Sequence, residues 1–306
     1  MVTEKTRAHL ALLFASVLSG VNYSFSKSIM PDYMTPAAFT LFRIGCAAVL
    51  FIITALLFKR EGIQKRDIPR FLLLALVGMA LNQSLYLNGL RYTSPVDASI
   101  ITTGIPLIVL IISAISLREK ITLKKMAGIV VGGIGALMIV IYGGFSGIGQ
   151  GQLGGNLLVL GSCVCYACYM LWVRALTQKY SPVTVMMYMY TLSALMLLPF
   201  NGKALFNTDF SNITPAVWGA FASVIIGSSF LAFFCTAYGL KRVKASTSAI
   251  YQYLQPIVAS VFAIFRGQDT WSVVKILAAL LVIAGVVIAT RSDKPILGRK
   301  NKSAEQ

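Results

Sequence analysis

The sequence predicts an all-α membrane protein with ten transmembrane helices, arranged as two inverted-topology five-helix repeats. Three observations lead to this fold class: the excess of apolar residues, the regular spacing of apolar segments, and landmarks that recur in both halves. Of the 306 residues, 57% are hydrophobic and only 12% are charged. Because soluble domains usually have about 25% charged residues, this composition excludes a soluble enzyme, a nucleic-acid-binding module and a disordered protein.

Ten segments contain the roughly 20 mostly apolar residues that a helix needs to cross a bilayer. Several begin at proline, as at Pro36, Pro182 and Pro215, because proline is well tolerated in the first turn of a helix. A small-residue pair, Gly128 and Gly132, predicts close helix packing in the fifth segment. The predicted spans are 10–29, 36–58, 71–90, 95–117, 125–142, 154–173, 182–200, 216–238, 245–265 and 272–290.

The distribution of Lys and Arg predicts the orientation of the chain. If the N-terminus is placed in the cytoplasm, cytoplasmic segments hold about five basic residues for each one in the outer loops. We therefore expect a multi-pass protein of the cell (inner or plasma) membrane with both termini cytoplasmic. The net charge of +17 is then a signal of topology, and no nucleic-acid partner is expected.

Landmarks recur between the two halves with an offset of about 150 residues. Since five spans per half is an odd number, the second half is expected to enter the membrane from the opposite side, as in many secondary transporters. The landmarks are Gly89, Leu90, Ile100 and Pro106 in the first half, and Gly239, Leu240, Ile250 and Pro256 in the second. The predicted units are a first repeat at 1–142, a Gly-rich outer linker at 143–153, a second repeat at 154–290 and a basic cytoplasmic tail at 291–306.

Residues of the first two spans resemble the drug/metabolite transporter superfamily, specifically its ten-span exporters with two EamA-type domains. In that family the first span typically carries Trp-Gly-x-Asn-Phe followed by a lysine, and the second carries an arginine after prolines. Asn22, Lys27 and Arg43 match this pattern, whereas Ser19 and Tyr23 replace the tryptophan and the phenylalanine. The resemblance covers nearly the whole chain. It implies a ten-helix transporter with a central cavity that exports amino acids, nucleosides, drugs or other metabolites.

Polar groups within the spans are the candidates for a substrate site, because such groups are costly in a bilayer and usually face the protein interior or a water-filled path. Gln252 and Gln255 are three residues apart and share a helix face, just before Pro256. Pro106 and Pro256 are predicted helix kinks. The predicted substrate-binding residues are Asn22, Lys27, Arg43, Asn82, Gln83, Tyr86, Tyr166, Tyr169, Gln252 and Gln255.

Structural interpretations of the same residues stay open at this point. Lys27 and Arg43 could each extend to the outer interface, and Arg43 could also have a structural pairing role. Asn82 could form a hydrogen bond between helices, and the tyrosines could be core residues. Asp97 is a weak candidate for a proton carrier, with an interfacial position as its alternative.

These observations predict a secondary transporter that moves a small organic metabolite by alternating access, and the family resemblance implies that it is an exporter. The expected partners are the substrate and the bilayer, with protons as coupling ion and a second copy of the chain as open alternatives. No cofactor and no metal are expected, since His9 is the single histidine. A lipid or lipid-linked-sugar flippase component is the main alternative function. A membrane-embedded enzyme and a sensor are less favoured, because the spans show no catalytic constellation.

Overall fold

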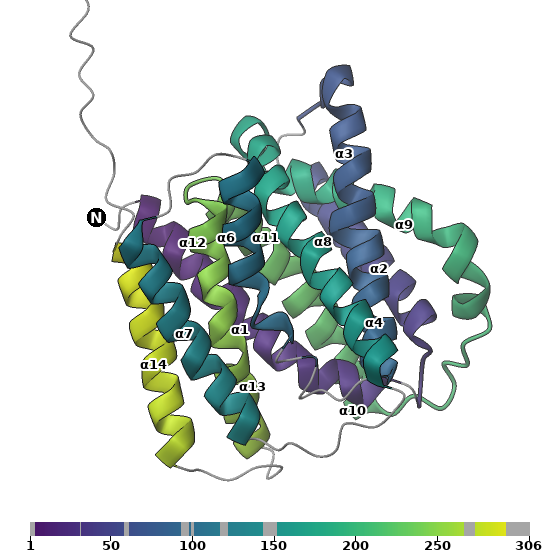
Figure 1. Ribbon diagram of the computed structural model, residues 1–306. Helices are drawn as coiled ribbons and strands as arrows, with labels where there is room; N and C mark the ends of the chain where they lie inside the picture. The colour runs from purple at the N-terminus through teal and green to yellow at the C-terminus, as the bar shows by residue number, and fades with distance from the viewer. Residues whose placement is uncertain are drawn as a thin grey trace, which may run out of the picture.

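The computed structural model shows a bundle of apolar helices, some long and others divided into short segments (Figure 1). It describes residues 4–30, 32–57, 61–92, 98, 101–116, 122–142, 152–265 and 273–291. All regular secondary structure within these ranges is helical, which confirms the predicted class. The predicted linker at 143–153 and tail at 291–306 lie almost entirely outside the described residues.

The longer helices and the π-helical segments follow one another in the same order in both halves of the chain. The first half contains α1 (Glu4–Ile29), α2 (Pro36–Leu57), η1 (Lys65–Asp67), α3 (Ile68–Ala75), η2 (Leu76–Leu81), α4 (Asn82–Tyr92), α6 (Ile105–Ser116) and α7 (Leu123–Tyr142). The second half contains α8 (Gln152–Lys179), α9 (Pro182–Phe206), α10 (Pro215–Ala222), η3 (Ser223–Ala232), α11 (Phe233–Leu240), α12 (Ala245–Ile250), η4 (Tyr251–Tyr253), α13 (Leu254–Phe265) and α14 (Val273–Arg291).

Six helical stretches are long and apolar enough to cross a membrane, and they coincide with six of the predicted spans. The other four predicted ranges also contain helices, namely α6, α7, α12 with α13, and α14. The total of ten spans stays a prediction. The six stretches are Glu4–Ser26, Pro36–Leu57, Lys65–Tyr92, Leu153–Lys179, Pro182–Phe206 and Pro215–Leu240.

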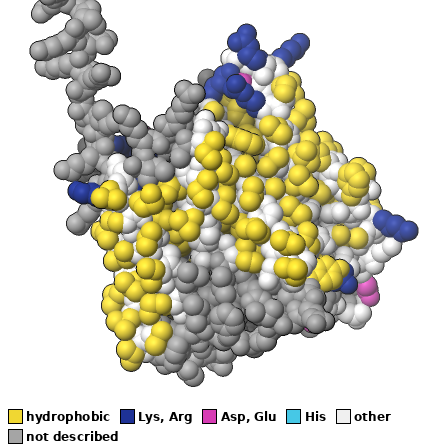
Figure 2. Space-filling view, viewed as in Figure 1, with side chains coloured by type: hydrophobic (Ala, Val, Ile, Leu, Met, Phe, Trp, Pro, Cys, Tyr) yellow, Lys and Arg dark blue, Asp and Glu magenta, His cyan; other side chains and the backbone are white. Residues whose placement is uncertain are grey.

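Hydrophobic side chains cover the sides of the bundle, and Lys and Arg gather at its margins (Figure 2). Leu57, Leu195 and Phe200 are among many large apolar side chains that are strongly exposed. Apolar surface of this extent would be a liability in water. The sides of the bundle are therefore suited to contact lipid.

The helices pair in a pattern that repeats when the two halves are exchanged. Helix α1 packs against α13 and against η3 and α11, whereas its counterpart α8 packs against α6 and against η2 and α4. Helix α2 packs along its own counterpart α9, and α7 packs along α14 (Figure 1). Such pairing is expected of two repeats related by an approximate two-fold axis.

Glycine allows α7 and α14 to approach closely. A Cβ atom added at Gly285 would collide with the backbone of Gly132 and lie 2.7 Å from the carbonyl oxygen of Gly128. A Cβ atom at Gly135 would lie 2.7 Å from the carbonyl oxygen of Ala278. The close packing predicted from Gly128 and Gly132 is therefore confirmed, and Gly285 is the glycine on the facing helix.

Both halves contain interrupted helices at corresponding places. The π-helical segment η2 divides α3 from α4, and η3 divides α10 from α11. The 3-10 segment η4 divides α12 from α13, and a turn at 103–104 precedes α6. Pro256 and Pro106 each lie in the first turn of the helix that follows such a break, where proline is well tolerated. Their role as kinks or hinges stays a prediction.

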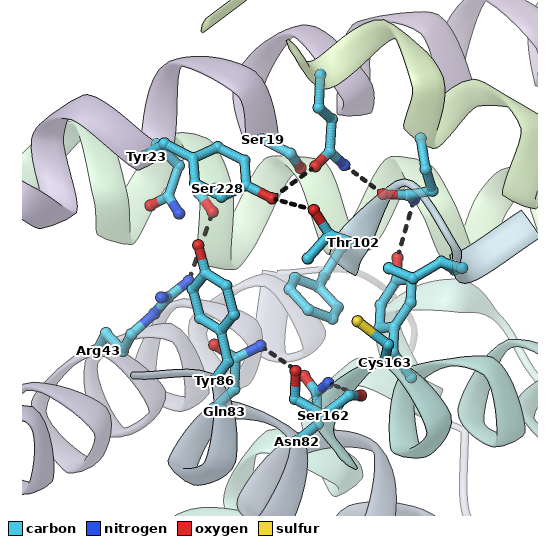
Figure 3. A pocket seen from close by; sticks show the side chains of 16 residues that line it. Ser19, Tyr23, Arg43, Asn82, Gln83, Tyr86, Thr102, Ser162, Cys163 and Ser228 are labelled. Atoms are coloured by element: carbon cyan, nitrogen blue, oxygen red, sulfur yellow. Dashed lines mark hydrogen bonds between the residues drawn. The ribbon is translucent and has the colours of Figure 1, made fainter. Parts of the chain in front are cut away.

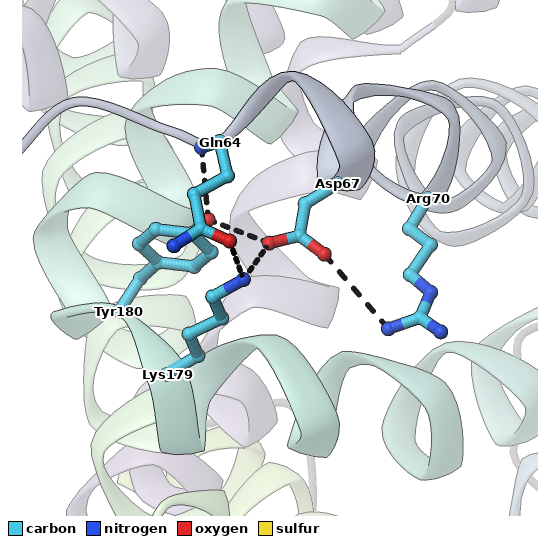
Figure 4. A network of polar contacts seen from close by, with 5 residues as sticks. All are labelled: Gln64, Asp67, Arg70, Lys179 and Tyr180. Carbon is cyan, nitrogen blue, oxygen red and sulfur yellow. Dashed lines mark hydrogen bonds and ion pairs between the residues drawn. The ribbon is translucent and has the colours of Figure 1, made fainter.

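A polar cluster joins the two halves at one end of the bundle (Figure 4). We call it the Asp67 cluster, and it consists of Gln64, Asp67, Lys179 and Tyr180. The Tyr180 hydroxyl donates to Oδ2 of Asp67 at 2.6 Å, and Lys179 Nζ donates to the same oxygen and to Oε1 of Gln64. Nη1 of Arg70 lies 3.9 Å from Oδ1 of Asp67. The cluster therefore connects the start of α3 with the end of α8.

The same end of the bundle carries the N-terminal end of α1. Nζ of Lys241 donates to the backbone oxygen of Tyr180 at 3.4 Å, and Nε of the adjacent Arg242 lies 3.6 Å from Oε2 of Glu4. Helix α1 therefore begins at the end where α8 finishes, so the first helices of the two halves run in opposite directions. We call this the basic end, because Lys65, Arg66, Arg70, Lys179, Lys241 and Arg242 lie there.

Candidate functional site

A polar cavity of about 100 Å³ lies within the bundle (Figure 3). Its walls come from α1, α2, α4 and the start of α6 in the first half, and from α8, η3, α11, η4 and α13 in the second. Pockets for drug-sized ligands measure about 300–1,000 Å³, so this conformation accommodates only a small solute. Eight of the ten predicted residues line it: Asn22, Arg43, Asn82, Gln83, Tyr86, Tyr166, Gln252 and Gln255.

A chain of side-chain hydrogen bonds crosses one wall of the cavity. The Tyr23 hydroxyl donates to Oε1 of Gln255 at 3.4 Å, and Nε2 of Gln255 donates to Oε1 of Gln252. Nε2 of Gln252 in turn donates to the Tyr166 hydroxyl at 3.3 Å. The two glutamines therefore face the same side, as their spacing predicts. Together with the tyrosines they connect α1, α13, η4 and α8.

The amides of α4 serve a structural role as well as lining the cavity. Nδ2 of Asn82 donates to the backbone oxygen of Ser162 on α8 at 2.7 Å. Nε2 of Gln83 donates to Oδ1 of Asn82 at 2.9 Å. Asn82 is buried, so its amide hydrogen bond connects α4 with α8 in an apolar environment. The helix-to-helix hydrogen bond that the sequence left open is thus present.

Arg43 brings a positive charge to the cavity wall. Its side chain is only 3% exposed. Nε donates to the Ser229 hydroxyl at 3.1 Å, and Nη2 donates to the Ser228 hydroxyl at 3.4 Å. The guanidinium carbon also lies 5.9 Å from the centre of the Phe39 ring. Within the described residues, no carboxylate oxygen lies within 4 Å of this guanidinium.

Aromatic rings form much of the remaining wall, but Tyr169 does not reach the cavity. The rings of Tyr23 and Tyr86 meet edge to face, with centroids 6.1 Å apart. Tyr166 lines the cavity, whereas Tyr169 is 0% exposed and packs beside it, with centroids 5.7 Å apart. A Cβ atom added at Gly78 would overlap the Tyr169 ring. Tyr169 is thus a core residue behind the wall, as the alternative interpretation of its sequence position allowed.

Two of the polar residues singled out in the sequence lie outside the described part of the structure. These are the side chain of Lys27, whose backbone belongs to α1, and the whole of Asp97. The predicted roles of both residues stay predictions.

Several lining residues carried no distinctive signal in the sequence. Serine is common in membrane helices, where its hydroxyl often bonds to the carbonyl oxygen one turn earlier. Ser193, for example, donates to the backbone oxygen of Met189. Tyr23 stood out in the sequence only as the residue in place of a family phenylalanine. The lining residues outside the predicted binding set are Ser19, Tyr23, Thr102, Ile105, Ser162, Cys163, Ser228 and Phe233.

The chemistry of the cavity is suited to binding a solute. Amides, hydroxyls and a guanidinium supply hydrogen-bond donors and acceptors on an aromatic wall. His9 lies apart from the cavity lining, with Nδ1 2.8 Å from the Tyr251 hydroxyl. In the part of the chain that the structure describes, no three His, Cys, Asp or Glu side chains converge as metal ligands would.

Both halves of the chain match one protein family model, the EamA-like transporter family, at residues 6–141 and 153–291. The chain is 28% identical over 287 residues to "Uncharacterized transporter YyaM" of Bacillus subtilis (strain 168), covering 92% of this chain and 93% of that protein. It is 27% identical over 261 residues to an "Uncharacterized transporter" of Archaeoglobus fulgidus, covering 85% of this chain and 90% of the relative.

A solved crystal structure has a similar fold. The two chains superpose with a TM-score of 0.75, covering 95% of this chain and 100% of the other. Their sequences are 18% identical. At this level of identity the likeness concerns the arrangement of the helices alone.

Proposed function

Because the chain belongs to the EamA-like transporter family, a family of membrane transporters, we propose that it exports a small organic metabolite by alternating access. The candidate solutes are amino acids, nucleosides and drug-like molecules. One observation carries the proposal: a polar cavity, lined from both halves, lies inside a bundle whose sides are apolar. Secondary transporters built from repeats bind their substrates at the repeat interface.

The proposed topology is ten spans in two inverted repeats, with both termini in the cytoplasm. Helix α1 begins and α8 ends at the basic end, which supports the inversion. The exchange of helix partners between the halves supports it as well. Because Lys and Arg are enriched in cytoplasmic segments, the basic end is assigned to the cytoplasmic side of the cell membrane.

The proposed conformational change separates the two halves alternately at each end. Opening of the cavity toward the basic end would require α3 and α8 to move apart, which breaks the contact between Asp67 and Lys179. The breaks before Pro106 and Pro256 interrupt the backbone of two helices close to the cavity. These breaks are the proposed hinges, because the residues at such points absorb large changes in backbone angles.

Counterflow in proteoliposomes tests this function. Vesicles that contain the purified protein are loaded in turn with amino acids, nucleosides or sugars, and uptake of trace labelled solute of the same class is followed with and without a pH gradient. We expect accumulation for one class, with stimulation by the gradient if protons are the coupling ion. Absence of counterflow for every class, from folded and inserted protein, would contradict the proposal. A fluorescent-lipid flipping assay would then test the flippase alternative.

A further inference from the structure

Arg43 is a buried cation whose described surroundings hold no balancing carboxylate. Its guanidinium contacts two serine hydroxyls and the face of Phe39, all of them uncharged. The acidic residues in the described part of the chain are Glu4, Asp32, Glu61, Asp67 and Asp209. None of these five residues lines the cavity.

A buried charge needs strong compensation, because removal of a guanidinium from water costs several kcal/mol. Two neutral hydroxyls provide part of it. An arginine side chain has five N–H donors, and the two serines use two of them. The remaining donors belong to a side chain that lines the cavity (Figure 3). The described lining of the cavity therefore favours the binding of a negatively charged group.

We propose that the transported solute carries a carboxylate and that Arg43 binds it; this inference rests on the proposed transport function. A guanidinium presents parallel N–H groups that match the two oxygens of a carboxylate. A carboxylate also suits the size of the site, because the one positive charge in the described lining and about 100 Å³ of space match a small monoanion. The described lining offers no carboxylate that would favour a cationic solute.

The remainder of the solute would lie against the polar and aromatic wall. Gln252 and Gln255 offer amide groups, and Tyr86 offers a ring close to that of Tyr23. The wall therefore tolerates apolar as well as hydroxylated solutes, and the carboxylate is the feature that the site selects. A neutral amide of the same shape should bind poorly, since it lacks the charge.

Binding of matched acids and amides to the purified protein tests this inference. The probes are lactate with lactamide and benzoate with benzamide, measured by isothermal titration and by thermal stabilisation at pH 7.5. At least one carboxylate should bind, with its amide about ten- to a hundredfold weaker, as expected for a charged hydrogen bond. Arg43→Gln should lower the affinity for the carboxylate by a similar factor and leave the affinity for the amide unchanged. Arg43→Lys should retain part of the affinity, because lysine keeps the positive charge but lacks the two parallel N–H donors of the guanidinium.

The exposed Arg66→Gln variant is the matched control and should bind as the wild type does. Equal binding of acids and amides by the wild type, or binding of neither acid, would overturn the inference even if Arg43→Gln does not fold. So would full carboxylate affinity in folded Arg43→Gln. Failure of the transport function is recognised separately, as absence of counterflow for every solute class. Counterflow of a neutral solute, with neither acid bound, would support the proposed transport function and contradict the proposal that the solute carries a carboxylate.

Discussion

At the scale of single residues, the cavity contains two kinds of amide. Asn82 bonds to the backbone of a neighbouring helix, whereas Gln252 bonds to other side chains of the cavity wall. Side-chain partners can rearrange around a solute at low cost. A backbone partner holds the packing of two helices. The two residues should therefore respond differently to truncation.

Gln252→Ala should reduce transport and leave the protein stable. The variant loses an amide that faces the cavity, and one hydrogen bond to a solute corresponds to about tenfold in affinity. We expect a fall of about tenfold in counterflow at low solute concentration, with a Tm close to that of the wild type. Gln178→Ala, which removes an exposed amide on α8, is the control and should transport normally. Wild-type flux in Gln252→Ala would remove this glutamine from the site.

Asn82→Ala should lower stability as well as transport. Loss of its bond to Ser162 leaves a buried carbonyl oxygen without that donor, at a cost of about 1 kcal/mol in the free energy of unfolding. Thermal unfolding in detergent measures the change. Asn88→Ala is the matched control, because among the described residues Asn88 bonds within its own helix, to the oxygen of Ser84. An unchanged Tm for Asn82→Ala would show that the inter-helix bond contributes little.

The sequence could predict the amides that line the described cavity but not its serines. An amide in an apolar span is unusual, so Gln252 and Asn82 could be identified from their positions within apolar segments. Ser228 and Ser229 were not, because a membrane serine usually bonds to its own helix. Tyr166 and Tyr169 share a helix face by spacing. Only the structure shows that Tyr169 is buried against Gly78 and does not line the cavity.

At the scale of helices, the contact between α7 and α14 depends on glycine. Gly285→Val should lower the free energy of unfolding by about 1–3 kcal/mol, since the new side chain would overlap the backbone of Gly132 and force the helices apart. Gly45→Ala, in α2, is the control because a Cβ atom there meets nothing within 4 Å. That control should raise stability slightly, as alanine favours helix over glycine. Equal Tm values for Gly285→Val and the wild type would contradict the close contact.

The contact between α3 and α8 depends on the charge of Asp67. Asp67→Asn removes the ion pair with Lys179 and weakens the bond from Tyr180, while it keeps the shape of the side chain. We expect a lower Tm in thermal unfolding, because the side chain of Asp67 is only 4% exposed, although that of Lys179 is partly exposed. Asp209→Asn is the control, since Asp209 accepts only from Ser211 and Asn212 in its own loop. A decrease in Tm no greater than that of the control would mean that the Asp67 cluster does not hold the two halves together.

Apolar runs and prolines were sufficient to locate the helices, but not their interruptions. The starts of α2, α9 and α10 at proline agree with the sequence. The π-helical segments η2 and η3 carry no proline. Their formation depends on packing against other helices, which a single span does not reveal. The Asp67 cluster likewise could not be predicted from the sequence, because its members are far apart in the chain.

At the scale of the whole molecule, the arrangement predicts which loops share a side of the membrane. Helix α9 has 25 residues, a length along its path of about 37 Å at 1.5 Å per residue, which exceeds the roughly 30 Å of a hydrocarbon core. Its two ends should therefore lie on opposite sides. The start of α9 follows Tyr180 at the basic end, so we predict that the 207–214 connection lies on the outer side.

Labelling of single cysteines with a membrane-impermeant maleimide tests this arrangement. The five native cysteines are replaced by alanine, and one cysteine is placed at Arg66, Gln178, Asn207 or Asn212, all of which are exposed. In inside-out vesicles, Arg66→Cys and Gln178→Cys should react and the other two should be protected. Right-side-out vesicles should give the reverse, because the positive-inside rule assigns the basic end to the cytoplasm. Labelling of all four positions from one side would contradict the crossing by α9. A reversed pattern would keep the crossing and exchange the two sides, so that the solute path would start from the opposite compartment.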